Sequence, residues 1–395
     1  MNPQATATTF GSVNDRQLPT GTRVGSIAMV STFPPTACGL ATFAAALATG
    51  MEANGATDIG VVRVGADDAS SSDRRVIGVL DPASARSRRN IATLLSAADV
   101  VLLQHEYGIY GDRDGIAVLD LLESIDRPVV TTLHSVPAEP SHRQRAVLEA
   151  VAERSRATVT MTWSARSRLL GGYSVDPERL ISIPHGATVF DGQAVTEPGL
   201  VLTWGLLGPG KGIEWVIDAI AALGTGDPLP RYLVAGATHP NIVRRDGESY
   251  RRMLEHRSVD RGIADRVNLD PTYRTVEELV ALVASADVVV LPYESTDQVT
   301  SGVLVDAIAA GVPVIATAFP HAVELLSDGA GIVVPHRDPA ALAAAIHAVL
   351  TRPQLRSSMV AAGRPIAERH RWDRVGAEYL NVLERSRIGD LGEVW

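Results

Sequence analysis

Short apolar runs alternate with amphipathic segments along most of this chain. Between the runs, apolar positions three and four residues apart predict helices, for example at 41–54, 116–124 and 141–155. Strand–helix alternation of this kind predicts a parallel sheet with helices on both faces. In the first half, the runs rich in Val, Ile and Leu predict buried strands at 24–30, 59–64, 100–104, 129–133, 158–162 and 180–183.

The alternation starts again after the polar stretch 191–198, and a last amphipathic helix is predicted at 372–386. The fold class is therefore α/β, with two doubly wound, Rossmann-like domains and an interdomain cleft. The second half predicts strands at 200–204, 231–235, 267–269, 288–291, 314–316 and 331–334, and helices at 213–223, 247–257, 276–285, 302–310 and 339–350. We expect a disordered segment at 1–22, a first domain at 23–195, a second at 196–371, and a C-terminal helix within 372–395 that packs back on the first domain.

The length and composition are those of a globular protein with two domains. The chain has 395 residues, of which 46% are apolar and 21% charged, and its formal net charge is −9. That charge argues against binding to nucleic acid phosphates. The single cysteine, Cys38, cannot form an internal disulfide, no apolar run is long enough to span a bilayer, and residues 1–22 lack the apolar core of a signal peptide. We therefore expect a cytoplasmic protein.

Lys211 is the only lysine in a chain with 36 Lys and Arg residues. It lies in the glycine-rich turn 205–212, which contains Gly208 and separates a predicted strand from a predicted helix. Backbone N–H groups at such a helix N-terminus collect around anions, and lysine adds a compact positive charge. The turn nearly spells a P-loop, but Gly212 replaces the Ser or Thr that would hold magnesium. We interpret it as a diphosphate site; the alternative is a surface turn without a function.

A second predicted helix begins after Thr300, Ser301 and Gly302. A hydroxyl and free backbone N–H groups there could bind phosphate oxygens. Asp306 lies on the same helix face as Gly302, one turn further on, where a carboxylate suits the hydroxyls of a ribose. The alternative is that Ser301 is only the helix N-cap and Asp306 a solvated surface group.

Three histidines follow predicted strands in the first half: His105, His134 and His185. Ligands of doubly wound sheets bind at the carboxyl ends of the strands, so each histidine could donate a hydrogen bond to a substrate or act as a general acid. The alternative for each is a structural role. No pair has the close spacing of a zinc motif, and we expect no metal site.

Together these segments resemble the retaining glycosyltransferases of family four, which have the GT-B fold of two Rossmann-like domains. The resemblance covers about residues 24–379 and is strong in the second domain and looser in the first. It is carried by the turn 205–212, by Ser285-Ala286-Asp287 before the strand that ends in Leu291-Pro292, by the stretch 306–316 with its Gly-Val-Pro-Val, by the proline-rich loop 33–40, and by His134.

The resemblance implies roles for individual residues. Lys211 would contact the diphosphate of a nucleotide-sugar donor, Asp306 would hold its ribose, and Gln298 and His134 would lie beside the donor sugar. His134, Lys211 and Gln298 are thus the catalytic candidates. The other candidates are Gly39, Gly208, Tyr273, Thr300, Ser301 and Gly302 for the donor, and His105, Glu106 and His185 for the acceptor side.

The family is independent of metals, needs no cofactor besides its nucleotide diphosphate sugar donor, and retains the anomeric configuration. The resemblance therefore implies transfer of a hexose to a hydroxyl group of a sugar, small-molecule or lipid-linked acceptor. A lipid-linked acceptor would bring peripheral membrane contact. The cluster Arg86, Arg88 and Arg89 would suit an anionic surface, although a solvated helix face explains it better. The sequence does not indicate the oligomeric state.

This chain departs from the family pattern at three positions. The family usually has arginine where Leu206 stands, and its two signature glutamates are replaced by Gln298 and Asp306. Loss of one charge-assisted contact costs about 1.5–3 kcal/mol, so diphosphate affinity should fall unless Arg244 or Arg245 substitutes. Two alternatives therefore stay open: a GT-B glycoside phosphorylase that uses inorganic phosphate, and a catalytically degraded sugar- or nucleotide-binding protein.

Overall fold

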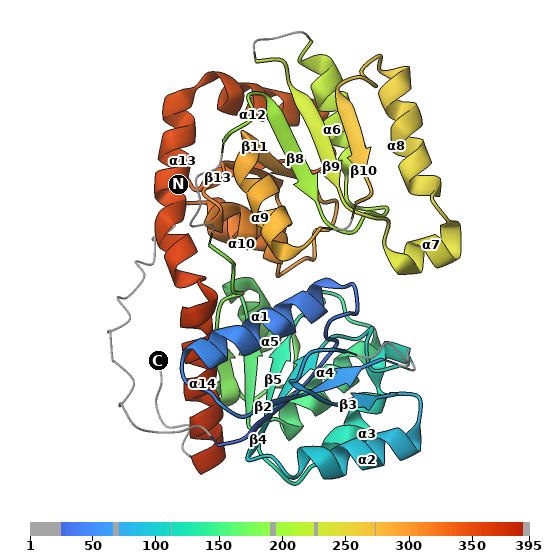
Figure 1. Ribbon diagram of the computed structural model, residues 1–395, viewed down its shortest axis with the longest axis vertical. Coiled ribbons are helices and arrows are strands. Elements are labelled where there is room, and N and C mark those ends of the chain that lie inside the picture. Colours follow the sequence, from blue (N-terminus) through green and yellow to red (C-terminus); the bar gives the residue numbers. More distant parts are fainter. Residues whose placement is uncertain are drawn as a thin grey trace, which may run out of the picture.

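The computed structural model describes residues 25–65, 71–111, 113–189, 195–224, 228–272 and 274–389. The predicted disordered segment at 1–22 lies outside this part of the chain. The described strands form two parallel sheets, each flanked by helices (Figure 1). One has seven strands in the order β3-β2-β1-β4-β5-β6-β7, and the other has six in the order β10-β9-β8-β11-β12-β13. The predicted α/β class with two Rossmann-like sheets is confirmed.

The first sheet consists of β1 (Ile27–Ser31), β2 (Ile59–Val64), β3 (Val76–Leu80), β4 (Val100–His105), β5 (Val129–Leu133), β6 (Ala157–Thr160) and β7 (Leu180–Ser182). The second consists of β8 (Leu200–Trp204), β9 (Arg231–Ala235), β10 (Val267–Asp270), β11 (Val288–Leu291), β12 (Val314–Thr317) and β13 (Gly331–Val334). The helices of the first half are α1 (Gly39–Ala53), α2 (Ala85–Leu95), α3 (Ala117–Glu123), α4 (His142–Arg154) and α5 (Trp163–Gly172). Those of the second half are α6 (Ile213–Ala222), α7 (Pro240–Asp246), α8 (Ser249–Asp260), α9 (Val276–Ser285), α10 (Gly302–Ala309), α11 (Pro320–Leu326), α12 (Pro339–Thr351), α13 (Pro353–Arg369) and α14 (Trp372–Ile388).

The helix predicted at 247–257 is displaced in the structure. Gly247 has a φ of +60°, a left-handed conformation that ends α7 and separates it from α8. The hydrophobic pattern alone also did not reveal α7. Its last turn carries Arg244 and Arg245, which are exposed and leave no apolar stripe to detect.

Both faces of the first sheet are buried, which explains its nearly continuous apolar strands. Alternate residues such as Met29 and Leu102 pack beneath α1 and α14, whereas Val30 and Leu103 face the side of α2 and α3. This alternation decides the direction of every side chain at the carboxyl ends of these strands.

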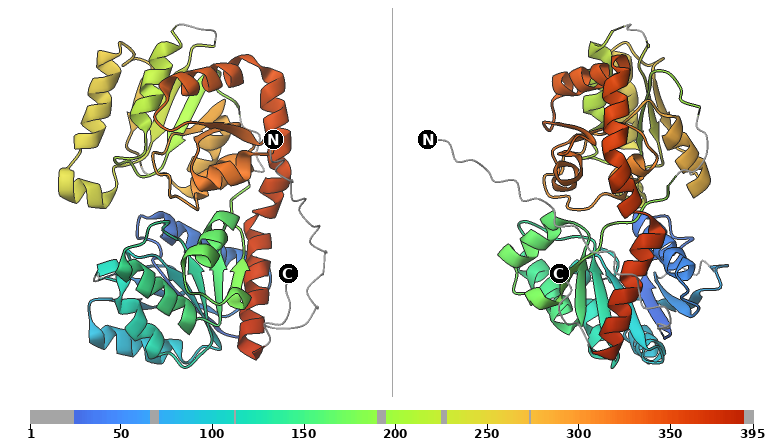
Figure 2. Two further views of the ribbon diagram at one scale, coloured as in Figure 1. Left: turned by 180° about the vertical axis from the view of Figure 1, so that it is seen from behind. Right: turned by 90° about the vertical axis from the view of Figure 1, so that its left-hand side faces the viewer.

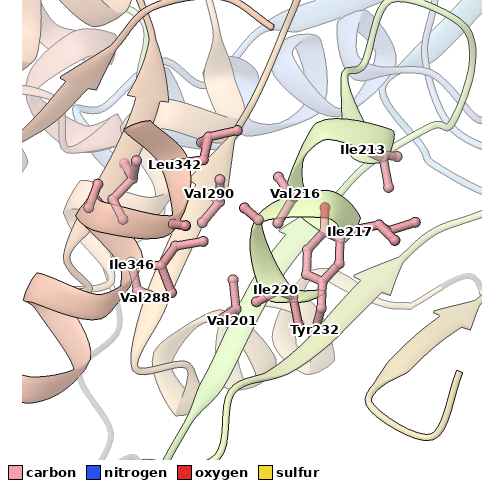
Figure 3. Packing of buried hydrophobic residues seen from close by; sticks show 14 of the residues in the cluster. Val201, Ile213, Val216, Ile217, Ile220, Tyr232, Val288, Val290, Leu342 and Ile346 are labelled. Atoms are coloured by element: carbon pink, nitrogen blue, oxygen red, sulfur yellow. The ribbon is translucent and has the colours of Figure 1, made fainter. Parts of the chain in front are cut away.

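The core of the second domain lies between β8, β9, β11, α6 and α12 (Figure 3). In Figure 3, Ile220 of α6 lies beside Val201 of β8 and Tyr232 of β9, and Val216 of α6 lies near Val290 of β11. The spacing of these α6 positions gives the helix one continuous apolar face.

The last two helices, α13 and α14, run along one side of both domains (Figure 2). The helix α13 packs against α10 of the second domain, and α14 packs against α1 of the first. Gly50 of α1 and Gly376 of α14 stand where the two helices meet, and a Cβ on either would overlap the backbone of the other helix. Glycine is therefore required at this crossing.

The two domains also meet through polar contacts away from these helices. Glu324 of α11 accepts hydrogen bonds from the backbone N–H groups of Trp163 and Ser164, at distances of 2.9 and 3.0 Å. It thus supplies acceptors for the N-terminus of α5, a helix of the other domain. Arg168 of α5 in turn reaches Asp297, in the loop after β11.

Candidate functional site

The glycine turn 205–212 leads from β8 into α6 and is closed by a hydrogen bond of 3.2 Å from the Lys211 N–H to the Gly208 carbonyl. Gly212 has a φ of +69°, and a Cβ there would overlap the carbonyl oxygen of Pro292. The Ser or Thr that a P-loop has at this position would therefore not fit here. The Glu294 N–H donates to the Gly210 carbonyl at 2.9 Å, so the loops after β8 and β11 are joined.

Lys211 is partly buried, and its Nζ lies 4.4 Å from the centre of the Tyr293 ring. Tyr293 is 2% exposed, and its carbonyl accepts hydrogen bonds from Thr317 Oγ1 at 2.6 Å and His336 Nδ1 at 2.9 Å. The ring therefore holds the ammonium group by a cation–π contact at the end of β11. Among the described residues, no carboxylate forms an ion pair with Lys211 in the structure.

The N-terminus of α10 is capped by Ser301, whose Oγ accepts the Leu304 N–H at 3.3 Å. The Ser301 N–H donates to His321 Nδ1 at 2.8 Å. Ser301 is only 4% exposed, so the structure gives it the alternative role of N-cap. The N–H groups of Gly302 and Val303 have no acceptor within α10, which leaves them as the donors available to an anion.

Thr300 and Gln298 lie in the loop that leads into α10. The Gln298 Nε2 donates to the Thr300 carbonyl at 3.1 Å, and the Thr300 hydroxyl is buried without a partner in the structure. This loop stands beside the glycine turn, because Glu294 at its start binds Gly210. Thr300, Gly302 and Lys211 therefore belong to neighbouring loops at the carboxyl end of the second sheet.

Asp306 shares a face of α10 with Gly302, as predicted, but the segment after β7 covers this face. The Asp306 carboxylate accepts the backbone N–H of Thr188, and burial raises its pKa to about 7. Gly302 contacts His185 of the same segment. Asp306 is therefore partly covered rather than fully solvated, and a ribose role for it stays a prediction.

His134 follows β5 and lies on the α1 side of the first sheet. Its Nε2 is 2.8 Å from Gln104 Oε1, and its ring meets the Phe43 ring edge-on at 4.8 Å. Burial lowers the pKa of His134 to about 3, so the ring is neutral at physiological pH. With Nε2–H donating to Gln104, Nδ1 is the acceptor nitrogen.

His185 lies next to His134 around the same phenylalanine. The Phe43 ring is 5.0 Å from His185 and 5.2 Å from Trp372. The His185 Nδ1–H donates to the Gly186 carbonyl at 2.6 Å, and burial lowers the pKa of the ring to about 4. The structure thus brings together His134 and His185, and through His185 it connects both to Gly302 of α10.

His105, the other strand-ending histidine, lies elsewhere. It is fully buried, and its ring stands between those of Tyr107 and Tyr110. Because neighbouring residues of a strand point to opposite faces, His105 faces away from Gln104 and His134. The prediction that it contacts an acceptor is therefore wrong for this structure, since no part of its side chain is accessible.

Glu106 follows β4 and is partly buried. Its Oε2 accepts the Ser135 hydroxyl at 2.5 Å, and its Oε1 accepts the Tyr107 N–H at 3.0 Å. Burial raises the pKa of the carboxyl group, and these hydrogen bonds oppose that rise. Glu106 thus bridges the loops after β4 and β5, beside His134.

The remaining predicted residues lie in different parts of the second domain or at the start of α1, or outside the described residues. Gly39 begins α1, and a Cβ there would meet nothing within 4 Å, so this end of the helix is open. Gly208 packs against Ile242 of α7, and Tyr273 lies outside the described residues. Arg244 binds Asn241 and Arg245 pairs with Asp246, so neither of these contacts reaches the glycine turn.

Sequence reasoning missed several residues that organise this region, namely Phe43, Gln104, Arg168, Tyr293, Asp297, His321 and Trp372. The rule that function follows strand ends could have found His321, which stands four residues after β12. Phe43 has no such signal, because an aromatic residue on the apolar face of a helix looks like any core residue.

Among the described residues, no group of three or more His, Cys, Asp or Glu residues could hold a metal ion. No described helix has the length and apolar character needed to cross a membrane.

Comparisons with known proteins agree with this architecture. The family model for glycosyl transferases group 1 matches residues 198–352, the region of the second sheet. A D-inositol 3-phosphate glycosyltransferase of Geodermatophilus obscurus is 32% identical over 276 residues, which are 62% of this chain and 59% of that protein. Phosphatidyl-myo-inositol mannosyltransferase of Mycobacterium leprae is 42% identical over 83 residues, or 21% of this chain and 22% of that protein. The chain thus spans about three fifths of the length of the first of these relatives.

Solved structures share the fold over nearly the whole chain. Anabaena HepE, in complex with UDP and glucose, matches with a TM-score of 0.72 at 15% identity, over 91% of this chain and 99% of that one. Sucrose-phosphate synthase from Thermosynechococcus elongatus matches with a TM-score of 0.72 at 18% identity, over 92% and 100%. The resemblance to the family-four glycosyltransferases is therefore confirmed: this chain has the GT-B fold, and its second domain has the sequence of a group 1 glycosyl transferase domain.

Proposed function

We propose that this chain is a cytoplasmic glycosyltransferase that moves a hexose from a nucleoside diphosphate sugar to an acceptor hydroxyl group, with retention of configuration and without a metal. The observation that supports the donor site is the junction of two loops. Lys211 lies in the turn after β8, the N-terminus of α10 ends the loop after β11, and the Glu294–Gly210 hydrogen bond joins the two.

The proposed role of this junction is to stabilise the leaving diphosphate. Negative charge develops on the leaving group as the bond to the sugar breaks, and an ammonium group with preorganised N–H donors stabilises it. Lys211 supplies the charge, and Gly302 and Val303 supply N–H groups. Lys211 would exchange its contact with the Tyr293 ring for the stronger one with phosphate oxygens.

The proposed sugar side of the site is the first domain. His134 is neutral and is held by Gln104, which leaves Nδ1 as an acceptor for a sugar hydroxyl group. Glu106 and Ser135 stand on the adjoining loops. Because HepE was solved with UDP and glucose, and several relatives are named for inositol 3-phosphate, UDP-glucose and D-inositol 3-phosphate are the first pair to test.

Calorimetric titration of UDP, GDP and ADP tests the donor site. We expect micromolar binding of one nucleoside diphosphate to the wild type, a loss of about tenfold or more in Lys211→Ala, and partial retention in Lys211→Arg. Turnover of the matching sugar nucleotide should be unaffected by EDTA, and its product should keep the anomeric configuration. Absence of nucleotide binding to the wild type would refute the proposed donor site.

The phosphorylase alternative is favoured by one observation. Leu206 supplies no cation, and the contacts of Arg244 with Asn241 and of Arg245 with Asp246 lie within their own helix. A single phosphate needs fewer cations than a diphosphate. Titration of inorganic phosphate distinguishes the two, since a phosphorylase binds phosphate and no nucleotide. A protein that binds a nucleotide without turnover of any donor would be the degraded binding protein.

A further inference from the structure

The loop after β11, which carries Gln298 and leads into α10, is held from the other domain. Arg168 of α5 donates through one guanidinium nitrogen to the Asp297 carbonyl at 2.7 Å and to Asp297 Oδ1 at 2.5 Å. The same Oδ1 accepts the backbone N–H of Ala138 at 3.0 Å. Asp297 therefore makes three hydrogen bonds to residues of the first domain.

Arg168 connects this loop to the one that carries His134. Its guanidinium also donates to the Val136 carbonyl at 3.0 Å. Val136 and Ala138 follow His134 in the loop after β5. One arginine side chain, 19% exposed, thus binds the loops of both domains that carry the sugar-side candidates His134 and Gln298.

Two residues beyond Asp297, an apolar contact strengthens the same junction. Val299 is 3% exposed and packs in a cluster whose other buried members belong to the first domain: Leu133, Val136, Leu148, Ala165, Leu169 and Leu180. The loop is therefore anchored at residues 297 and 299. Gln298 lies between these anchors, and α10 begins three residues after the second one.

We propose that Arg168 and Asp297 are positioning residues that align the N-terminus of α10 with the His134 loop. The role of this alignment in catalysis rests on the proposed function. The donor N–H groups of α10 are held in place by the first domain, so the diphosphate site is complete only when the two domains are in contact. Preorganisation of this kind raises affinity without adding any contact to the ligand.

The partial exposure of the pair agrees with a positioning role. The Asp297 side chain is 46% exposed, and ion pairs of that exposure add little to global stability. Loss of the pair should therefore free the loop and leave the two folded domains intact. The exposed position also makes Asp297→Ala a variant that keeps its fold.

Hydrogen–deuterium exchange of peptides covering residues 297–304 tests the proposal on the full chain, without a ligand. We expect exchange in this segment to accelerate about tenfold in Arg168→Ala and Asp297→Ala, and to stay near the wild-type rate in Arg168→Lys, which keeps a donor for the carbonyls. Glu324→Ala is the matched control, because Glu324 also joins the two domains but does not touch this loop. It should leave the segment unchanged.

Calorimetry with UDP, GDP and ADP provides the second measurement. For whichever nucleotide the wild type binds, the dissociation constant should rise about tenfold in Arg168→Ala and stay within about twofold in Glu324→Ala. Unchanged exchange in both loop variants, or an equal change in Glu324→Ala, would overturn the proposal. If the wild type binds no nucleotide, the proposed function fails, and the exchange result alone decides whether Arg168 and Asp297 position α10.

Discussion

The imidazole ring of His185, from the first domain, lies directly against Gly302, the first residue of α10 in the second. A Cβ on Gly302 would lie 2.8 Å from Cε1 and 2.9 Å from Nε2 of this ring. Phe43 and Trp372 flank the ring and limit its movement. Glycine is therefore required at position 302 by the contact between the two domains.

Gly302→Ala should consequently separate the two domains at this point. We expect overpacking to lower the free energy of unfolding by about 1–3 kcal/mol and to weaken binding of a nucleoside diphosphate. Denaturant unfolding measures the first effect and calorimetry the second. Gly171→Ala is the control, because its Cβ would meet nothing within 4 Å and alanine favours the helix α5. Equal stability of Gly302→Ala and the wild type would show that His185 moves aside freely.

Leu206→Arg should restore the cation that this chain lacks in the glycine turn. One charge-assisted contact is worth about 1.5–3 kcal/mol, so the dissociation constant for the bound nucleoside diphosphate should fall about ten- to a hundredfold. Calorimetry with Leu206→Gln as the control separates the charge from the change of shape. No gain in affinity would mean that a side chain at position 206 does not face the diphosphate.

Asp306→Asn should change how stability depends on pH. The pKa of Asp306 is raised from 3.8 to about 7 in the folded protein, so the folded state holds a proton that the unfolded state has released. The stabilisation of the fold that this bound proton provides is fully present below about pH 4. It is lost as the pH rises through about 7, at up to about 1.4 kcal/mol per pH unit. Asparagine imitates the neutral acid and can still accept the Thr188 N–H. The variant should therefore gain stability relative to the wild type between pH 4.5 and 7, and a constant difference across that range would contradict the prediction.

His321→Ala should destabilise the start of α10. The ring is 1% exposed and accepts the Ser301 N–H, so its removal leaves a buried donor without a partner, at a cost of about 1–3 kcal/mol. His321→Asn should recover part of this loss, because its amide oxygen can take the place of Nδ1. Thermal or denaturant unfolding measures both variants, with His347→Ala on the exposed face of α12 as the control. A loss no greater than that of the control would rule out this role.

Buried strands were the part of the fold that local pattern predicted best. The runs at 59–64, 129–133, 200–204 and 288–291 are strands with those same bounds, because parallel strands covered on both faces are apolar at nearly all positions. β3 was missed because it is an edge strand whose residues alternate between partial burial and exposure. The helix α13 was missed because it is largely polar and contains Pro365.

The residues of the site also fall into those that local sequence indicated and those that it could not assign. Sequence alone indicated the glycine turn with Lys211, the start of α10 and the strand-ending histidines, since each depends on residues adjacent in the chain. The strand pattern could not distinguish His134 from His105, and only the resemblance to the family separated them. His105 ends β4 and His134 directly follows β5, and the packing of helices on the two faces of the sheet leaves one at the domain boundary and buries the other.

Tertiary structure alone decided which distant residues meet. Ser301 and His321 are 20 positions apart, and Arg168 and Asp297 are 129 apart, so no local pattern couples them. The sequence by itself determined two Rossmann-like domains and an anion-binding turn, because hydrophobic period and glycine conformation are local properties. The contacts that hold α10 against the first domain follow only from how the two finished domains pack, since that packing brings together side chains whose separate segments carry no sign of one another.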